Sequence, residues 1–215
     1  MSAALDPLDQ LLRGEARLWR GREQARGVVG LPTGFTALDA ALPGGGWPRG
    51  ALSEVLAERP GIGELSLLLP ALAQLTREGH AVALISPPRR PCVAALLAAD
   101  LRLPQLYLID ASAEDAWWAA ELLLREGGCA AVLLWPQRVD ERRLRRLQLA
   151  AEDADGWAII SGDLRAARHS SPAALRLALS AADGDLAIEL RKCRGGQRQP
   201  VLLRGGLPAN LPHLH

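Results

Sequence analysis

The chain has 215 residues, of which 49% are hydrophobic and 23% charged, values typical of a globular protein and not of a disordered one. This length suits one sizeable domain with a real core and at most a small appendage. The formal net charge of +1 excludes a general attraction of the whole chain to nucleic acid, so any such contact has to come from local clusters of charge.

The cysteines and the most apolar segments indicate the cellular compartment in which the protein is expected. Cys92, Cys129 and Cys193 are odd in number, widely spaced and free of Cys-x-x-Cys pairing, which argues against a disulfide framework or a zinc site and favours a reducing compartment. Residues 1–12 lack the apolar core of a signal peptide, and the most apolar run, 65–75, is too short to span a bilayer. We therefore expect a cytoplasmic protein that holds no metal and meets no membrane.

The chain begins with a segment whose apolar residues recur at roughly helical spacing. Within 8–26 these are leucines, Ala16 and Trp19, with arginines among and after them, a pattern that indicates a short amphipathic helix with a basic tail. Glycines and Pro32 then interrupt the periodicity. Residues 1–30 are therefore predicted to form an N-terminal helical arm and linker.

From residue 51 onward, short apolar runs alternate with helical stretches. Strands are predicted at 51–56, 81–86, 106–109, 130–135 and 157–161, and helices at 64–77, 91–100, 113–126, 141–152. Such alternation predicts an α/β fold with a mostly parallel sheet and helices on both faces. Ser112, three residues before Asp115, is typical of a helix cap.

After residue 170 the pattern changes to three strand-like segments separated by Gly-rich turns. They cover 175–181, 185–192 and 200–204, and they predict antiparallel strands at the C-terminal end of the sheet. The predicted core domain thus spans 31–204, followed by a tail at 205–215.

The turn after the first strand, within 57–69, stands where a nucleotide-binding α/β protein would carry its phosphate-gripping loop. That loop needs a first glycine, four further residues, and then Gly-Lys-Ser/Thr. Measured from Gly63, the first-glycine position holds Glu58, the lysine position Glu64 and the hydroxyl position Leu65. Only one of the four fixed positions is present, so the loop is a degenerate one.

No neighbouring register repairs the loop, because the chain's single lysine is Lys192. We expect Glu64 to satisfy the free N–H groups of the helix start and to repel a polyphosphate. The alternatives here are a tight turn at Gly61 and Gly63 or residual nucleotide binding. Pro70 is expected to kink or restart the helix that follows.

Several segments carry a resemblance to known proteins. The stretch 31–55, with its Thr-Gly, Leu-Asp and Gly-Gly-Gly pattern, and Arg-Glu-Gly-His at 77–80 resemble the start of the RecA ATPase core. Segments 59–65, 86–91 and 142–152 resemble more closely the ImuA family, RecA-like accessory proteins of bacterial translesion DNA synthesis that are also described as SulA-like. The resemblance covers about residues 31–204 and implies a RecA-like core.

The RecA resemblance also defines where two catalytic carboxylates would stand. The glutamate that activates water would follow the second strand, but this strand runs into Pro87, Pro88 and Arg89. The magnesium-binding aspartate would end the strand at 130–135, but that strand leads to Trp135 and Pro136. Phosphoryl transfer depends on positioning and charge neutralisation. The sequence therefore predicts a pseudo-ATPase with no catalytic residues and no cofactor.

The ImuA resemblance implies a non-catalytic adaptor in SOS-induced mutagenic translesion synthesis. Its implied partners are an ImuB-like polymerase-related protein, an error-prone polymerase of the DNA polymerase III alpha type and RecA, with DNA contacted directly or indirectly at the nucleoid. Two alternatives stay open: a degenerate RecA-type NTPase or DNA-binding recombination factor, and a SulA-type inhibitor of cell division. The arm would dock on a RecA-fold surface through Leu12, Trp19 and Arg20, unless it folds back on its own domain.

Two clusters of positive charge are candidates for DNA or partner contact. Arg142, Arg143 and Arg146 lie on the helical face opposite the apolar one; the alternative is a solvated face partly paired with Asp140 and Glu141.

The second cluster is the predicted C-terminal hairpin. It contributes Arg191, Lys192, Arg194 and Arg198 without a nearby acid, and solvated hairpin arginines are again the alternative. The stretch matching the second DNA-binding loop of RecA, 164–172, is short and weakly basic, which argues against filament-type DNA binding.

Overall fold

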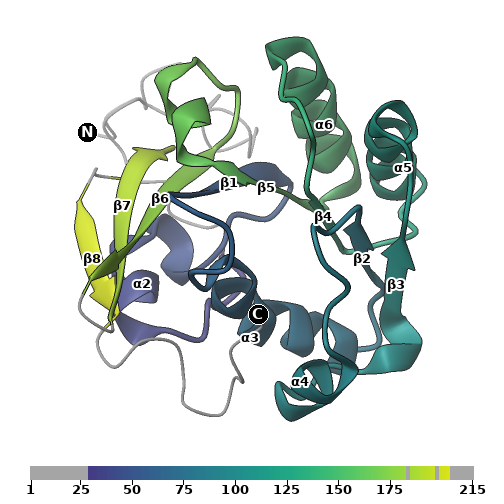
Figure 1. The fold of residues 1–215 in the computed structure, drawn as a ribbon, viewed down its shortest axis with the longest axis horizontal. Helices are drawn as coiled ribbons and strands as arrows, with labels where there is room; N and C mark the ends of the chain where they lie inside the picture. The colour runs from purple at the N-terminus through teal and green to yellow at the C-terminus, as the bar shows by residue number, and fades with distance from the viewer. Residues whose placement is uncertain (1–28, 183–184, 197–198, 204–215) are drawn as a thin grey trace, which may run out of the picture.

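The computed structural model describes residues 29–182, 185–196 and 199–203. Within them lies an eight-stranded sheet of order β3-β2-β4-β5-β1-β6-β7-β8 (Figure 1). The strands from β3 to β6 in this order run parallel, and β7 and β8 complete the sheet antiparallel. The predicted α/β class and mostly parallel sheet with antiparallel strands at the C-terminal end are confirmed.

The strands are β1 (Ala51–Ala57), β2 (Val82–Ile85), β3 (Leu106–Ile109), β4 (Ala131–Leu134), β5 (Trp157–Asp163), β6 (Leu175–Ala182), β7 (Asp185–Cys193) and β8 (Pro200–Leu203). The α-helices are α2 (Thr36–Ala41), α3 (Glu64–Arg77), α4 (Val93–Ala98), α5 (Ala113–Arg125) and α6 (Glu141–Ala154). Three short 3-10 helices join them: η1 (Pro43–Gly45), η2 (Leu103–Gln105) and η3 (Leu164–Arg168). Within the described ranges, no helix is both long and apolar enough to cross a bilayer.

Helices cover both faces of the sheet. α2, α3 and α4 lie on one face, and α5 and α6 lie on the other (Figure 1). Each face has its own buried cluster, with Trp47 and Leu72 in the first and Leu124 and Leu147 in the second. Because both faces are covered, β1, β2 and β4 are buried along their whole length, which accounts for their continuous apolar sequences.

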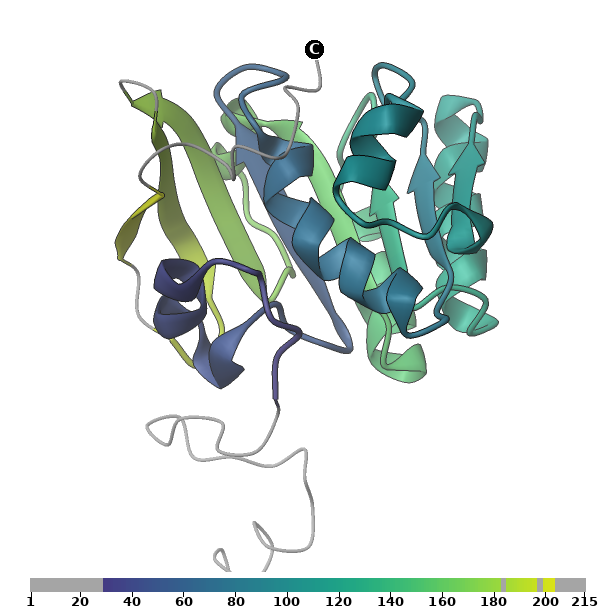
Figure 2. The same ribbon diagram turned by 90° about the horizontal axis from the view of Figure 1, so that it is seen from below.

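The parallel arrangement brings the carboxyl ends of β1 to β6 to one edge of the sheet. Figure 1 looks down on this edge, and Figure 2 shows the strands from the side with their arrowheads at the top. In open α/β sheets, ligands bind outside the carboxyl ends of the strands. The loops that leave this edge are therefore the first place to look for a site.

The structure differs from the sequence expectations within α3. The helix runs without interruption from Glu64 to Arg77 with Pro70 inside it, so the predicted restart at Pro70 is wrong. An interior proline costs about 3 kcal/mol, but ten of the fourteen residues of α3 are buried, and each buried leucine contributes about 1.5–3 kcal/mol. Tertiary packing thus outweighs the local penalty. The short helix α2 was not predicted either, because its only buried residue is Leu38.

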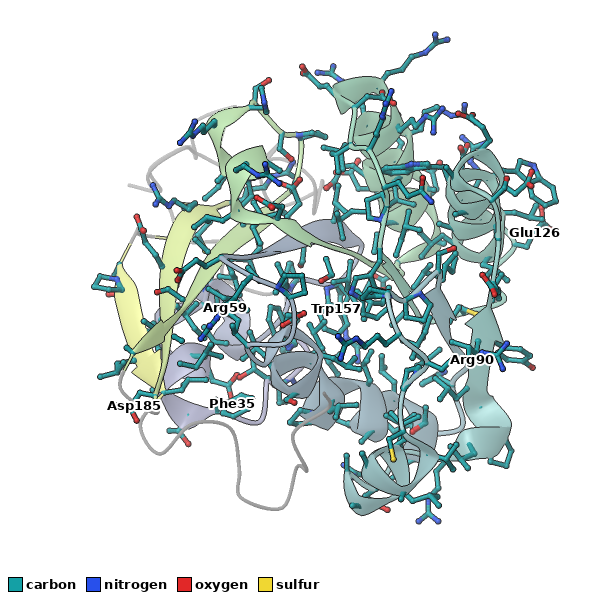
Figure 3. The ribbon with its side chains drawn as sticks, in the orientation of Figure 1. Phe35, Arg59, Arg90, Glu126, Trp157 and Asp185 are labelled. Carbon is teal, nitrogen blue, oxygen red and sulfur yellow. The ribbon has the colours of Figure 1, made fainter. Side chains whose placement is uncertain are left out.

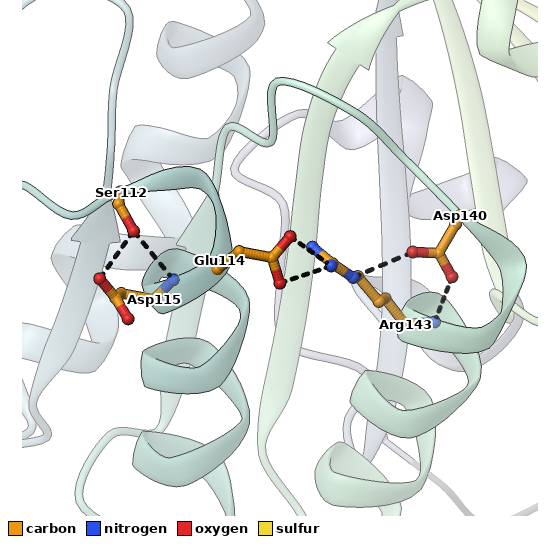
Figure 4. A network of polar contacts seen from close by, with 5 residues as sticks. All are labelled: Ser112, Glu114, Asp115, Asp140 and Arg143. Atoms are coloured by element: carbon orange, nitrogen blue, oxygen red, sulfur yellow. Dashed lines mark hydrogen bonds and ion pairs between the residues drawn. The ribbon is translucent and has the colours of Figure 1, made fainter.

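The start of α5 follows the predicted capping signal. The Ser112 hydroxyl accepts the Asp115 N–H at 3.3 Å and donates to the Asp115 carboxylate at 2.6 Å (Figure 4). The adjacent tryptophans of α5 face different surroundings, since Trp117 is 7% exposed and Trp118 is 62% exposed. Successive residues of a helix point in different directions, so one of the pair is buried and the other is exposed.

The predicted domain boundaries stay predictions. Most of the N-terminal arm (1–30) and the whole tail (205–215) lie outside the described residues.

Candidate functional site

The turn between β1 and α3 occupies the position of a phosphate-gripping loop, and it is closed by a carboxylate of the chain itself. Glu64, the first residue of α3, turns its side chain back over the turn. Its Oε1 accepts the Gly61 N–H at 2.8 Å, and its Oε2 accepts the Gly63 N–H at 3.2 Å. Two backbone donors that could meet a phosphate are thus already bonded.

The local conformation of this turn depends on glycine. Gly61 and Gly63 have φ values of 82° and 120°, which residues with a Cβ rarely adopt. These conformations aim both N–H groups at one point, where the Glu64 carboxylate lies, only 8% exposed. The degenerate loop therefore retains the concave shape of an anion site, while Leu65 packs partly buried against the core.

The neighbouring loops at this edge end β2 and β4. After β2, Ser86 takes a left-handed conformation with φ of 50° and donates its hydroxyl to the Ala111 carbonyl at 3.1 Å. After β4, the Trp135 side chain packs against the core cluster. The carboxylate of Asp110 directly follows β3, and that of Asp163 ends β5. Among the described residues, no group of three or more His, Cys, Asp or Glu side chains could hold a metal ion.

A row of buried charge crosses the middle of the sheet on the α5–α6 face. Glu54 of β1 lies beside Arg176 of β6, which lies beside Lys192 of β7. Arg176 Nε forms an ion pair with Glu54 Oε2, and the two side chains are only 8% and 1% exposed. Burial is the main cause that lowers the pKa of Lys192, and the positive charges of Arg194 and Arg176 lower it further. The negative charge of Glu54 acts in the opposite direction. Glu54 and Arg176 thus form a buried pair, and Lys192 at the end of the row is half-buried.

This row of charge holds the segment 164–171 in place. Arg176 donates from Nη1 to the His169 carbonyl at 2.8 Å and from Nη2 to the Ala166 carbonyl at 2.9 Å. Lys192 donates to the Ser171 carbonyl at 2.7 Å. The segment that corresponds by position to a DNA-binding loop is thus fastened to the sheet by three charge-assisted hydrogen bonds.

Arg143, one of the α6 arginines predicted to contact DNA or a partner, is bonded within the chain. Its Nη2 lies 2.7 Å from both carboxylate oxygens of Glu114 on α5, and its Nε lies 3.0 Å from Asp140 (Figure 4). The hydrogen bond to Glu114 is the main cause that raises the pKa of Arg143. The guanidinium also stands 5.9 Å from the centre of the Trp117 ring. Arg143 thus joins α6 to α5.

The other arginines of this face are held to different degrees. Arg146 pairs with Glu121 of α5 at 2.6 Å, and Arg145 reaches Glu141 at 3.5 Å. Arg142 is exposed and has no ion-pair partner among the residues described. A groove of about 180 Å³ between α5 and α6 is lined by residues of both helices, including Trp118 and Arg146. The paired alternative thus describes most of this face, and Arg142 alone stays fully available.

The cations of the C-terminal hairpin are bonded as well. Arg191 pairs with Glu189 at 2.9 Å, Lys192 lies in the buried row, and Arg194 reaches Glu152 at 3.5 Å. Arg198 lies outside the described residues, as do Leu12, Trp19 and Arg20 of the predicted arm. The structure does not gather the two predicted clusters into one surface.

Exposed apolar side chains collect on a different part of the molecule. Tyr107 and Leu108 of the edge strand β3 are 54% and 46% exposed. Val93 and Leu97 of α4, on one face of the sheet, and Trp118 of α5, on the other face beside α6, are each more than half exposed. Exposed apolar groups on and around an unpaired strand edge are typical of protein contact sites.

Sequence reasoning missed the pair of Glu54 and Arg176. The available signal was a charge inside each of two otherwise apolar strands, Ala-Leu-Ser-Glu-Val and Leu-Arg-Leu-Ala-Leu. Charged side chains are rarely fully buried unless paired, so two such strands in one sheet predict an ion pair. Without the strand order, neither partner could be assigned.

Comparison with known proteins adds a relationship to this geometry. No protein-family model matches the chain. It is similar to the protein RecA of Francisella philomiragia subsp. philomiragia, 30% identical over 137 residues, which is 62% of this chain and 38% of the relative. The RecA proteins of Francisella tularensis subsp. novicida and subsp. tularensis are 29% identical over the same shares. The chain thus spans 38% of the length of these curated relatives, and the match supports a RecA-like relationship in agreement with the fold.

Proposed function

We propose that this chain is a non-catalytic RecA-like adaptor of the ImuA type, acting in SOS-induced mutagenic translesion DNA synthesis. It works by binding an ImuB-like protein and an error-prone polymerase, with contact to RecA. The observation that carries the proposal is the bonding of Glu64 to the N–H groups of Gly61 and Gly63. A carboxylate in that place opposes the entry of a polyphosphate, because the two negative charges compete for the same donors.

The lack of catalytic side chains supports the same proposal. A RecA-type ATPase needs a lysine in the loop, a water-activating glutamate after β2 and a magnesium-binding aspartate after β4. These positions hold Glu64, the Pro87–Arg89 run and Trp135. The chain therefore lacks the loop lysine and both catalytic carboxylates at these places, and we propose that it hydrolyses no nucleotide.

The exposed apolar residues around β3 support a function through protein contact. Buried aromatic anchors dominate the binding energy of protein interfaces, and Tyr107 and Trp118 are large aromatics that this chain leaves exposed. We assign this surface to the ImuB-like partner. Since the surface lies on β3, α4 and α5 and not in the turn before α3, partner binding needs no nucleotide.

The test is complex formation between the purified chain and the ImuB-like protein of the same organism, measured by interferometry with and without ATP and magnesium. We expect the same affinity in both conditions. Tyr107→Asp should weaken the complex by about tenfold or more, as expected for an interface anchor. The matched control Leu149→Asp alters an α6 residue that is 49% exposed and should leave the affinity unchanged. An affinity that depends on ATP, or equal losses in both variants, would contradict the proposal.

A further inference from the structure

Of the arginines without an ion-pair partner among the described residues, only Arg142 was singled out by the sequence pattern. Arg59 follows β1, Arg89 and Arg90 follow β2, and Arg138 follows β4; all four are exposed. None has an ion-pair partner within the described residues, whereas Arg143, Arg146, Arg191 and Arg194 all do. We call these four free side chains the arginine rim. Figure 3 looks onto this edge of the sheet and labels Arg59 and Arg90.

The strand order makes the rim continuous. β2, β4, β5 and β1 are consecutive neighbours in the sheet, so the loops that follow them lie side by side at the carboxyl edge. Adjacent strands are about 4.8 Å apart, so the ends of the four strands span roughly 14 Å, with Arg59 and Arg90 on opposite sides of the row (Figure 3). After β5, Arg165 is bonded to Asp163 at 2.8 Å, and Arg168 of η3 adds one more exposed arginine without an ion-pair partner among the described residues.

Acids of this edge do not cancel the rim. The Glu64 carboxylate is bonded to backbone N–H groups, and Asp140 is bonded to Arg143. The two acids without an ion-pair partner here are Glu58, next to Arg59, and Asp110, which follows the outermost strand β3. The free arginines of this edge thus outnumber these two acids, which lie at the two ends of the row.

Two prolines restrict the backbone on either side of two of these arginines. Arg89 and Arg90 stand between Pro88 and Pro91, whose rings fix the backbone angle φ. Pre-ordered donors lose less conformational entropy when a ligand binds. The guanidinium group presents a planar fork that fits carboxylate and phosphate groups, so the ligand is an anion.

The surroundings favour carboxylates over a nucleic acid. The aromatic residues that are largely exposed among those described are Tyr107 and Trp118, and neither belongs to the rim loops, so unpaired bases have no stacking surface there. The formal net charge of +1 gives no long-range attraction to a polyphosphate. An extended peptide covers about 3.3 Å per residue, and roughly four residues rich in Asp and Glu would therefore span the rim.

We propose that the arginine rim binds an extended acidic segment of a partner protein across the carboxyl ends of β2, β4, β5 and β1. The segment's carboxylates form paired hydrogen bonds with Arg89, Arg90 and Arg138. The proposal rests on the adaptor function, because a nucleotide bound at this edge would compete for the same arginines. Its test uses neither nucleotide nor translesion partner, and the two proposals can therefore fail separately.

The test is fluorescence anisotropy with a labelled peptide of six alternating Asp and Glu residues, added to the full chain. Gln substitution of Arg89, Arg90 and Arg138 together should weaken binding by about tenfold or more. The matched control substitutes Arg49, Arg102 and Arg125 by Gln, which removes the same charge from exposed sites at the opposite edge of the sheet, and should change affinity less than about twofold. A peptide of Asn and Gln should not bind, and raising the salt to about 1 M should abolish binding of the acidic peptide.

Two results would overturn the proposal. Equal weakening by the rim and control variants would show that the peptide responds to overall charge and not to this site. In a competition experiment, an oligonucleotide, single-stranded or duplex, could displace the labelled peptide at a lower concentration of negative charges than unlabelled peptide requires. If the rim variant lost this binding of the oligonucleotide, the rim would be assigned to nucleic acid instead. Circular dichroism of each variant checks that the fold is kept, as expected for exposed arginines, whose ion pairs contribute less than about 1 kcal/mol.

Discussion

At the scale of single residues, two carboxylates on neighbouring elements serve different purposes. Glu64 neutralises the start of α3 by bonding to Gly61 and Gly63, and this removes the most favourable anion position of the edge. Glu54 neutralises Arg176 inside the sheet, and this allows Arg176 to reach the backbone of the 164–171 segment. Glu64 thus occupies the anion position before α3, and Glu54 allows Arg176 to bond to the 164–171 segment.

The buried pair leads to a prediction on stability. Glu54→Gln leaves the Arg176 charge buried without a counter-ion, and breaking a buried pair in this way costs about 3–5 kcal/mol. We expect a loss of that size in the free energy of unfolding, measured by urea denaturation. Proteases should also cleave the chain more easily within 164–171, because the hydrogen bonds from Arg176 to this segment weaken.

A matched control for this change is Asp163→Asn. Asp163 and Arg165 form an exposed pair in the adjoining turn, and exposed pairs contribute less than about 1 kcal/mol. Similar losses for Glu54→Gln and Asp163→Asn would mean that the Glu54–Arg176 pair carries no special weight.

At the scale of elements, the helix α3 and the loop before β1 fit together at one contact. Gly34 has a φ of 85°, and a Cβ added there would lie 2.5 Å from the Cβ of Pro70. Pro70 interrupts the hydrogen bonding of α3 without ending it. The proline and the glycine are thus matched, since the ring of one occupies the space that the other leaves empty.

Gly34→Ala should therefore destabilise the chain more than a left-handed backbone conformation alone explains. Gly45→Ala is the comparison, because Gly45 has a φ of 72° and no atom within 4 Å of its added Cβ. The left-handed conformation costs about 1–2 kcal/mol in each variant, and only Gly34→Ala adds the clash with Pro70. Thermal unfolding of both variants measures the difference, and an equal loss would show that the contact yields without cost.

The sequence predicts elements better than it predicts which side chains are free. Continuous apolar runs and Gly-Gly turns place the strands near their observed bounds, because burial of both sheet faces depends on local composition. Arg143 was placed on a basic face from helical periodicity, but its partner Glu114 is 29 positions away on α5. Periodicity specifies a face and not what packs against it, so the pairing appears only once α5 and α6 are side by side.

The candidate site shows the same limit. The missing lysine and the presence of Glu64 were readable from motif spacing, and so was the expectation that Glu64 satisfies the helix start. The free arginines at Arg59, Arg89, Arg90 and Arg138 were not, because strand order decides which loops are neighbours. Four residues scattered over 80 positions gave no local pattern.

At the scale of the whole molecule, the sheet separates three surfaces. The carboxyl edge carries the closed turn at Glu64 together with the arginine rim, the β3 side carries exposed apolar residues, and the α5–α6 face carries paired charges. A RecA-like scaffold whose nucleotide position is filled leaves its edges available for protein partners. We therefore propose that contacts at these edges, and not a reaction, are what the fold provides.

The central claim is that Glu64 takes the place of a triphosphate, and the most direct test is a thermal-shift titration of the purified chain with ATP and magnesium. Ligand at 100 times its dissociation constant would stabilise the fold by about 2.7 kcal/mol, which corresponds to a rise of roughly 5–10 °C in the unfolding temperature for a chain of this size. We predict no rise up to millimolar ATP. A saturable rise of that size in the unaltered chain would contradict the claim.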